Sequence, residues 1–178
     1  MIKPLVITVF LFMLIFITSC ADNTENLKKG NEAMNRKSWQ EALSYYNKAL
    51  ELDQKCVEAL SKKGYILGVQ GKVEEGLACL DKAIEIKPDY GDAWSNKSYV
   101  LYIQGKFDEA NKAVERALEI NQKDVKAWCH KGNIFQVQEK YDEAIKNYDK
   151  AIELDPKNME PWKYKGIALI SSNKADEA

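Results

Sequence analysis

Residues 91–124 read GDAWSNKSYVLYIQGKFDEANKAVERALEINQKD, and residues 125–158 repeat the same pattern of small, aromatic and acidic residues. Outward from this stretch, alanine, tryptophan and a small residue each return after 34 positions, without insertion or deletion. Self-similarity at a fixed period is typical of an array of stacked structural repeats. The recurring residues are Ala49, Ala83, Ala117 and Ala151; Gly30, Gly64, Ser98, Gly132 and Gly166; and Trp94, Trp128 and Trp162.

Each copy predicts two antiparallel helices. In residues 91–124, Trp94 and Leu101 lie on the stripe that an amphipathic helix turns towards a core. Residues 104–106 form a short turn, and Ala110 and Ala117 give the second helix a narrow apolar face that lets the two helices approach closely. Because one such hairpin cannot bury its apolar face alone, the copies must stack into a continuous core.

This period and these residues resemble the tetratricopeptide repeat family. The resemblance implies an all-α fold, a right-handed superhelical array of antiparallel helix pairs with four full repeats and a partial fifth. The array occupies residues 26–178, and its repeats are 23–56, 57–90, 91–124, 125–158 and the partial 159–178.

In this family, ligands commonly lie in a concave groove lined by the first helix of each repeat. The resemblance therefore implies a protein or peptide partner and no small-molecule substrate. Tyrosine rings suit peptide contact, and side-chain amides can hydrogen-bond a peptide backbone. The alternative is that these residues only cover the groove in water. The predicted partner-binding residues are Tyr65, Tyr99, Tyr102, Lys126, Asn133 and Gln136, and the other groove positions are Glu58, Ser61, Val69, Asp92, Ser95, Ile103, Cys129 and Val137.

Some members of the family bind chaperone C-termini through a carboxylate clamp. The best window here supplies Asn96, Lys126 and His130, but Ser61 and Tyr65 stand where the clamp requires lysine and asparagine. A neutral imidazole is also a poor replacement for the forked arginine side chain. We therefore expect no clamp.

The first twenty residues differ from the rest of the chain. Lys3 precedes an apolar run over residues 5–18. This run is shorter than the roughly 20 residues of a spanning helix and suits a signal peptide. It ends at Ile17-Thr18-Ser19-Cys20, which resembles a lipobox. The resemblance implies a signal peptide at residues 1–19, a lipid-modified Cys20 carrying diacylglycerol and an acyl chain such as palmitate, and a tether over residues 20–25. An ordinary cleaved signal and an uncleaved short anchor are the alternatives.

A lysine precedes the small residue in every copy, where the family often has leucine. A long stem lying along the helix surface with its ammonium in water explains such a residue. The alternative is a basic ladder for an acidic partner. The row consists of Lys29, Lys63, Lys97, Lys131 and Lys165.

The composition argues against several other functions. Twenty-six basic residues balance twenty-seven acidic ones, whereas a nucleic-acid binder usually has a basic excess. Cys56, Cys79 and Cys129 form no CxxC pair, and the single histidine, His130, has no metal-ligand spacing. There is no phosphate-binding loop and no nucleophile elbow. We expect no enzyme activity, no metal and no cofactor.

The last repeat stops at the start of its second helix, so Trp162, Ile167 and Leu169 are predicted to lack a partner helix. Solenoids normally end in a polar cap. We therefore expect either a fragment of a longer protein or an edge that docks on something, including a second copy.

The sequence predicts a membrane-anchored scaffold on the extracytoplasmic face of a cell membrane, acting in assembly of envelope complexes. The alternatives are an accessory or N-terminal binding module of a larger protein or enzyme complex that continues past residue 178, and a soluble secreted binder with an unmodified Cys20.

Overall fold

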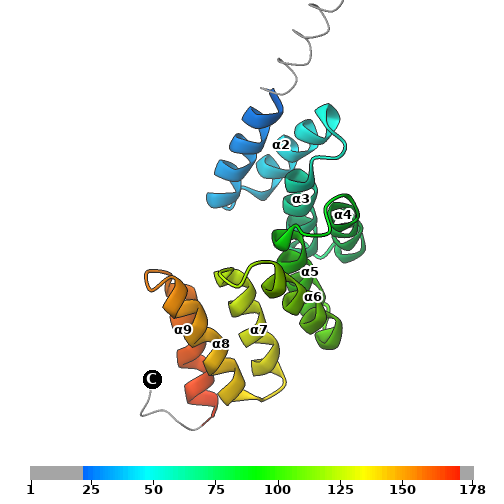
Figure 1. Cartoon of the computed structure of the whole chain (residues 1–178). Helices are drawn as coiled ribbons and strands as arrows, with labels where there is room; N and C mark the ends of the chain where they lie inside the picture. The colour runs from blue at the N-terminus through cyan, green and yellow to red at the C-terminus, as the bar shows by residue number, and fades with distance from the viewer. Residues whose placement is uncertain (1–21, 173–178) are drawn as a thin grey trace, which may run out of the picture.

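In the computed structural model, residues 22–172 are described, and they form helices joined by short turns (Figure 1). The helices run over residues 22–35, α2 (Trp39–Leu52), α3 (Val57–Val69), α4 (Val73–Ile86), α5 (Gly91–Ile103), α6 (Phe107–Ile120), α7 (Val125–Val137), α8 (Tyr141–Leu154) and α9 (Met159–Ser171). The predicted all-α array of antiparallel helix pairs is confirmed. Cys20 and the apolar run before it lie outside the described residues, and no helix within residues 22–172 is long and apolar enough to cross a membrane.

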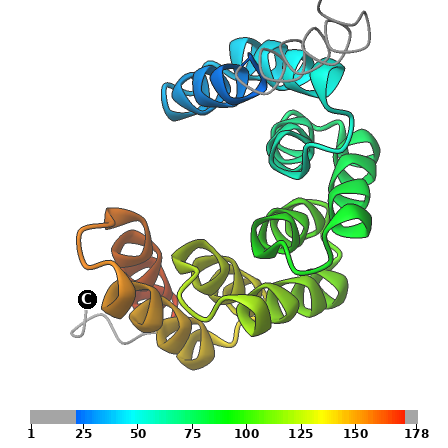
Figure 2. The same ribbon diagram turned by 45° about the horizontal axis from the view of Figure 1, so that its top comes forward.

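The helix pairs stack into a curved array. Figure 2 shows the first helices, such as α3 and α5, on the inner side of the curve, and the second helices, such as α4, on the outer side. Helices α3, α5 and α7 each pack against their own second helix and against the first helix of the next repeat. The core is therefore continuous across repeat boundaries, as in the cluster that joins Leu80 and Ala83 to Ala93 and Val100.

Small residues set the distance between paired helices. A Cβ added at Gly64 would lie 2.7 Å from the carbonyl oxygen of Gly76 on the facing helix. At Gly132, an added Cβ would collide with the ring of Tyr148, which is fully buried. In the third repeat Ser98 fits the same position because its hydroxyl donates to the carbonyl of Ala110 at 2.8 Å.

The turns between paired helices share one geometry. Gly71 and Gly105 adopt positive φ angles of 84° and 79°, and Lys37 and Glu139 hold the same repeat position at 59° and 60°. The residue after each of these donates its amide five residues back, as Lys106 does to Leu101. This bond satisfies a carbonyl at the end of the first helix.

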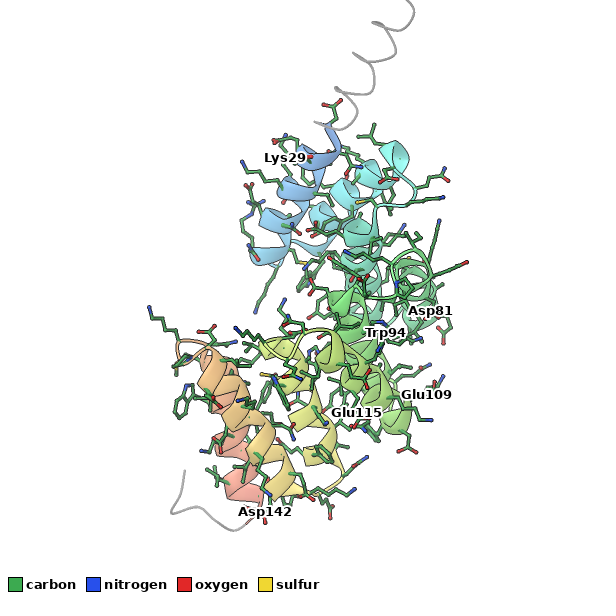
Figure 3. The ribbon with its side chains drawn as sticks, viewed as in Figure 1. Lys29, Asp81, Trp94, Glu109, Glu115 and Asp142 are labelled. Carbon is green, nitrogen blue, oxygen red and sulfur yellow. The ribbon has the colours of Figure 1, made fainter. Side chains whose placement is uncertain are left out.

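The regularly spaced lysines of the lysine row, apart from Lys29, bind side chains of the neighbouring repeat. Lys97 Nζ lies 2.6 Å from Asp81 Oδ1. Asp81, labelled in Figure 3, lies on α4, the second helix of the preceding repeat. Lys131 pairs with Glu115 at 3.5 Å, and Lys165 pairs with Asp149 at 2.8 Å. The row therefore links neighbouring repeats in addition to keeping its charges at the surface. Lys63 donates a hydrogen bond to Asn47 of the preceding repeat, and Lys29 forms an ion pair with Glu25 within its own helix.

The C-terminal edge of the array carries both exposed and buried apolar side chains. Trp162 is 45% exposed and Ile167 40% exposed, whereas Leu169 is 2% exposed. Helix α9 packs against α8 of the preceding repeat. The prediction that these three residues lack a partner helix concerns the chain after residue 172, which lies outside the described residues.

Candidate functional site

One pocket lies on the inner side of the curve, and helices of all five repeats contribute to it. Its volume is about 580 Å³, including the solvent at its open mouth. The helix over residues 22–35 and helices α3, α5, α7 and α9 supply its lining residues. Figure 2 shows that the array curves so that first helices such as α3 and α5 lie on its inner side. The lining residues are Met34, Tyr65, Asn96, Tyr99, Lys126, Cys129, His130, Asn133, Glu160 and Tyr164.

Aromatic rings form much of the wall. The ring centroid of Tyr99 lies 5.6 Å from that of Tyr65 and 4.9 Å from that of His130. Tyr102 continues the series at 6.2 Å from Tyr99, with its ring against Phe107 at 5.9 Å. Contacts between rings at these separations hold the side chains in defined orientations. The wall is therefore a preformed surface.

His130 is neutral and has a defined tautomer. Its Nδ1 lies 3.2 Å from the carbonyl oxygen of Ser95. Because a carbonyl can only accept, Nδ1 carries the hydrogen and Nε2 keeps its lone pair. Burial lowers the pKa of His130 to about 4, although the bond to Ser95 opposes this, and the nearby Lys126 lowers the pKa further. At neutral pH the ring is thus an uncharged acceptor.

Two of the ten lining side chains, Lys126 and Glu160, are charged at neutral pH. Both are exposed, and no ion pair joins them. The Tyr164 hydroxyl donates to Glu160 Oε1 at 3.2 Å. Burial, the charge of Glu160 and this bond raise the pKa of Tyr164 to about 12. Burial first, then Glu160, likewise raises the pKa of the Cys129 thiol to about 12, so Cys129 is no nucleophile at neutral pH.

The amide side chains are tied into the fold. The hydroxyl of Tyr148 lies 2.8 Å from both Asn133 and Gln136. Since one hydroxyl carries one hydrogen, it donates to one amide oxygen and accepts from the other amide group. Asn96 donates to the hydroxyl of Ser61 at 3.0 Å. These amides therefore help to hold neighbouring helices together, whether or not they also contact a ligand.

The structure brings together four of the six predicted partner-binding residues. Tyr65, Tyr99, Lys126 and Asn133 line the pocket. The other two lie beside it: Tyr102 stacks on Tyr99, and Gln136 contacts Tyr148. Sequence reasoning missed Met34, Glu160 and Tyr164 as lining residues, although each is a multiple of 34 positions from a residue it had considered: Tyr102, Lys126 and His130 respectively.

An apolar row runs across three successive repeats. Val69 is 39% exposed, Ile103 42% and Val137 46%. They occupy the same position near the end of the first helix in three successive repeats. Such side chains at regular intervals offer contacts to an elongated ligand.

Among residues 22–172, no group of three His, Cys, Asp or Glu side chains could hold a metal ion. The cysteines at positions 56, 79 and 129 are free.

Comparison with known proteins agrees with this architecture. Family models described as "Tetratricopeptide repeat" match residues 27–90, 91–124 and 125–158. These are repeat families, whose domains are generally non-catalytic. No curated protein sequence matches the chain significantly.

Solved structures show the same fold. MamA from Desulfovibrio magneticus RS-1 is 20% identical, with a TM-score of 0.65 and 88% of each chain covered. YrrB, described as a TPR protein with an unusual peptide-binding site, is 24% identical, with a TM-score of 0.57, 85% of this chain and 78% of that chain covered. The first TPR of Spaghetti (RPAP3), bound to the HSP90 peptide SRMEEVD, is 25% identical, with a TM-score of 0.61, 68% of this chain and 96% of that chain covered.

Proposed function

Because the chain belongs to the tetratricopeptide repeat family, we propose that it is a binding scaffold that holds a segment of a partner protein in its concave groove. The observation that carries this proposal is the convergence of all five repeats on one aromatic-walled pocket. Rigid rings with exposed faces provide contact area at little entropic cost. The apolar row of Val69, Ile103 and Val137 supports a ligand longer than one side chain.

The relatives support a peptide as the ligand. Spaghetti was solved with a peptide from HSP90, and YrrB has a peptide-binding site by its description. Both resemble this chain along most of their own length. A peptide in the groove is thus the ligand class that we propose here.

Tyr99→Ala is expected to weaken partner capture at least about fivefold, because Tyr99 is at the centre of the ring series and lines the pocket. The measurement is affinity capture from detergent-solubilised membranes, followed by titration of the captured protein against each variant. Circular dichroism should show unchanged helix content.

Tyr45→Ala is the matched control. Tyr45 lies on the second helix α2 outside the pocket, where Lys48 Nζ is 5.2 Å from its ring centroid. Capture by this variant should equal that of the parent chain. Equal capture by the Tyr99→Ala variant would contradict the assignment of the groove.

We further propose that the scaffold is anchored by a lipid on Cys20 to the extracytoplasmic face of a cell membrane and acts in envelope assembly. The support is the sequence: an apolar run that ends at a lipobox-like Ile17-Thr18-Ser19-Cys20. Mass spectrometry of the mature N-terminus in membrane fractions tests the anchor. Acyl chains on Cys20 are expected, and an unmodified cysteine would contradict it.

Self-association through the C-terminal edge stays a prediction. Its support is the exposure of apolar side chains on α9, where Ile170 is 63% and Met159 71% exposed.

A further inference from the structure

The pocket carries several groups that attract a hydrogen-bond donor or a cation. Three tyrosines, Tyr65, Tyr99 and Tyr164, line it together. The face of an aromatic ring carries partial negative charge and attracts ammonium or guanidinium groups. Burial, followed by Tyr99 and Glu160, raises the pKa of Tyr65 to about 12, and burial and Glu160 raise the pKa of Tyr164 to about 12, so these two phenols remain uncharged at neutral pH.

His130 adds an acceptor to the pocket lining. Its Nδ1–H is used by the carbonyl of Ser95, which leaves the lone pair on Nε2. An arginine at this position would offer several donors, as the carboxylate clamp requires. His130 in this tautomer presents the opposite polarity, so it favours a ligand that donates.

Glu160 supplies the negative charge. One of its carboxylate oxygens accepts from Tyr164, which orients the carboxylate, and the side chain is exposed and forms no ion pair within residues 22–172. Glu160 and Tyr65 line the same pocket, and the charge of Glu160 adds to the effects of burial and of Tyr99 in raising the pKa of Tyr65. Lys126 is the opposing charge in the lining. Lys126 could therefore pair with an acidic group of the ligand, next to a ligand cation held by Glu160.

We propose that the pocket binds an arginine or lysine side chain of the partner segment, held over the tyrosine rings and paired with Glu160. This inference rests on the proposed function, since it names the chemistry of the segment that the groove takes.

The test uses short fluorescein-labelled peptide pools of equal length, with arginine, leucine or glutamate fixed at the centre and the other positions randomised. Fluorescence anisotropy measures their binding to the parent chain. The arginine pool should bind about tenfold more tightly than the other two pools. Glu160→Lys should weaken binding of the arginine pool about tenfold, and Lys126→Glu should strengthen its binding several-fold.

Glu85→Lys is the matched charge reversal, because Glu85 is exposed on α4 and lies outside the pocket. With this variant, the Kd for the arginine pool should stay within about twofold of the parent value. An equal effect of Glu85→Lys and Glu160→Lys would overturn the inference, since it would mean that only the net charge matters.

The remaining outcomes separate the inference from the proposed function. If the leucine or glutamate pool binds best and Tyr99→Ala still weakens it, the groove binds peptides but the cation inference is wrong. If Tyr99→Ala changes the binding of no pool, both the groove assignment and the inference fail.

Discussion

At the residue scale, the glycine position that recurs in the repeats faces different neighbours, so each repeat leaves a different amount of space for a side chain there. Gly30 and Gly132 lie opposite the tyrosines Tyr46 and Tyr148, and an added Cβ would collide with either ring. Gly64 instead lies opposite the Gly76 backbone. Gly166 has no atom within 4 Å of the site of a Cβ among the described residues.

This difference predicts opposite effects of one substitution. Gly64→Ala should lower the free energy of unfolding by about 1–3 kcal/mol, because the new Cβ would meet backbone atoms that cannot rotate away. Gly166→Ala should raise it by about 0.5–1 kcal/mol, because alanine favours the helix and meets nothing. Urea denaturation checks both. A loss of similar size at both positions would contradict the packing described for α3 and α4.

Much of the site was predictable at this scale, and some of it was not. Tyr65, Tyr99, Lys126 and Asn133 followed from the family resemblance, which implies a groove along the first helices, together with the repeat register. The tautomer of His130 did not, because it depends on the carbonyl of Ser95, 35 positions earlier, and on the angle between their helices. A sequence pattern places side chains on a face but does not determine their hydrogen-bond partners.

At the element scale, the turn between paired helices requires a left-handed residue. Glycine provides this conformation without strain in Gly71 and Gly105, whereas Lys37 and Glu139 adopt it with a Cβ. The glycine at 105 was predicted as part of a turn, but the same geometry at Glu139 has no signature in the sequence.

Exchange at these turns should change stability in opposite directions. Gly105→Ala should lower the free energy of unfolding by about 1 kcal/mol, because alanine is strained at a φ of 79°. Glu139→Gly should raise it by about 0.5 kcal/mol, since relief of strain exceeds the added entropy of the unfolded chain. Thermal unfolding measures both shifts. A stabilised Gly105→Ala variant would be incompatible with the turn geometry.

At the scale of the whole molecule, curvature arises from one interface repeated along the chain. Each first helix packs on the first helix of the next repeat, and the lysine row links neighbouring repeats on their other side. The 34-residue period predicted the stacking. It did not predict that residues from the first and fifth repeats, Met34 and Glu160, would line one pocket, because small rotations between repeats accumulate along the array.

The most direct test of the account is chemical-shift mapping of the backbone amides during titration with the peptide that binds most tightly. The account predicts that the perturbed amides cluster in residues 22–35, α3, α5, α7 and α9, around Tyr65, Tyr99 and His130. Perturbations concentrated in the second helices α2, α4, α6 and α8 would contradict it.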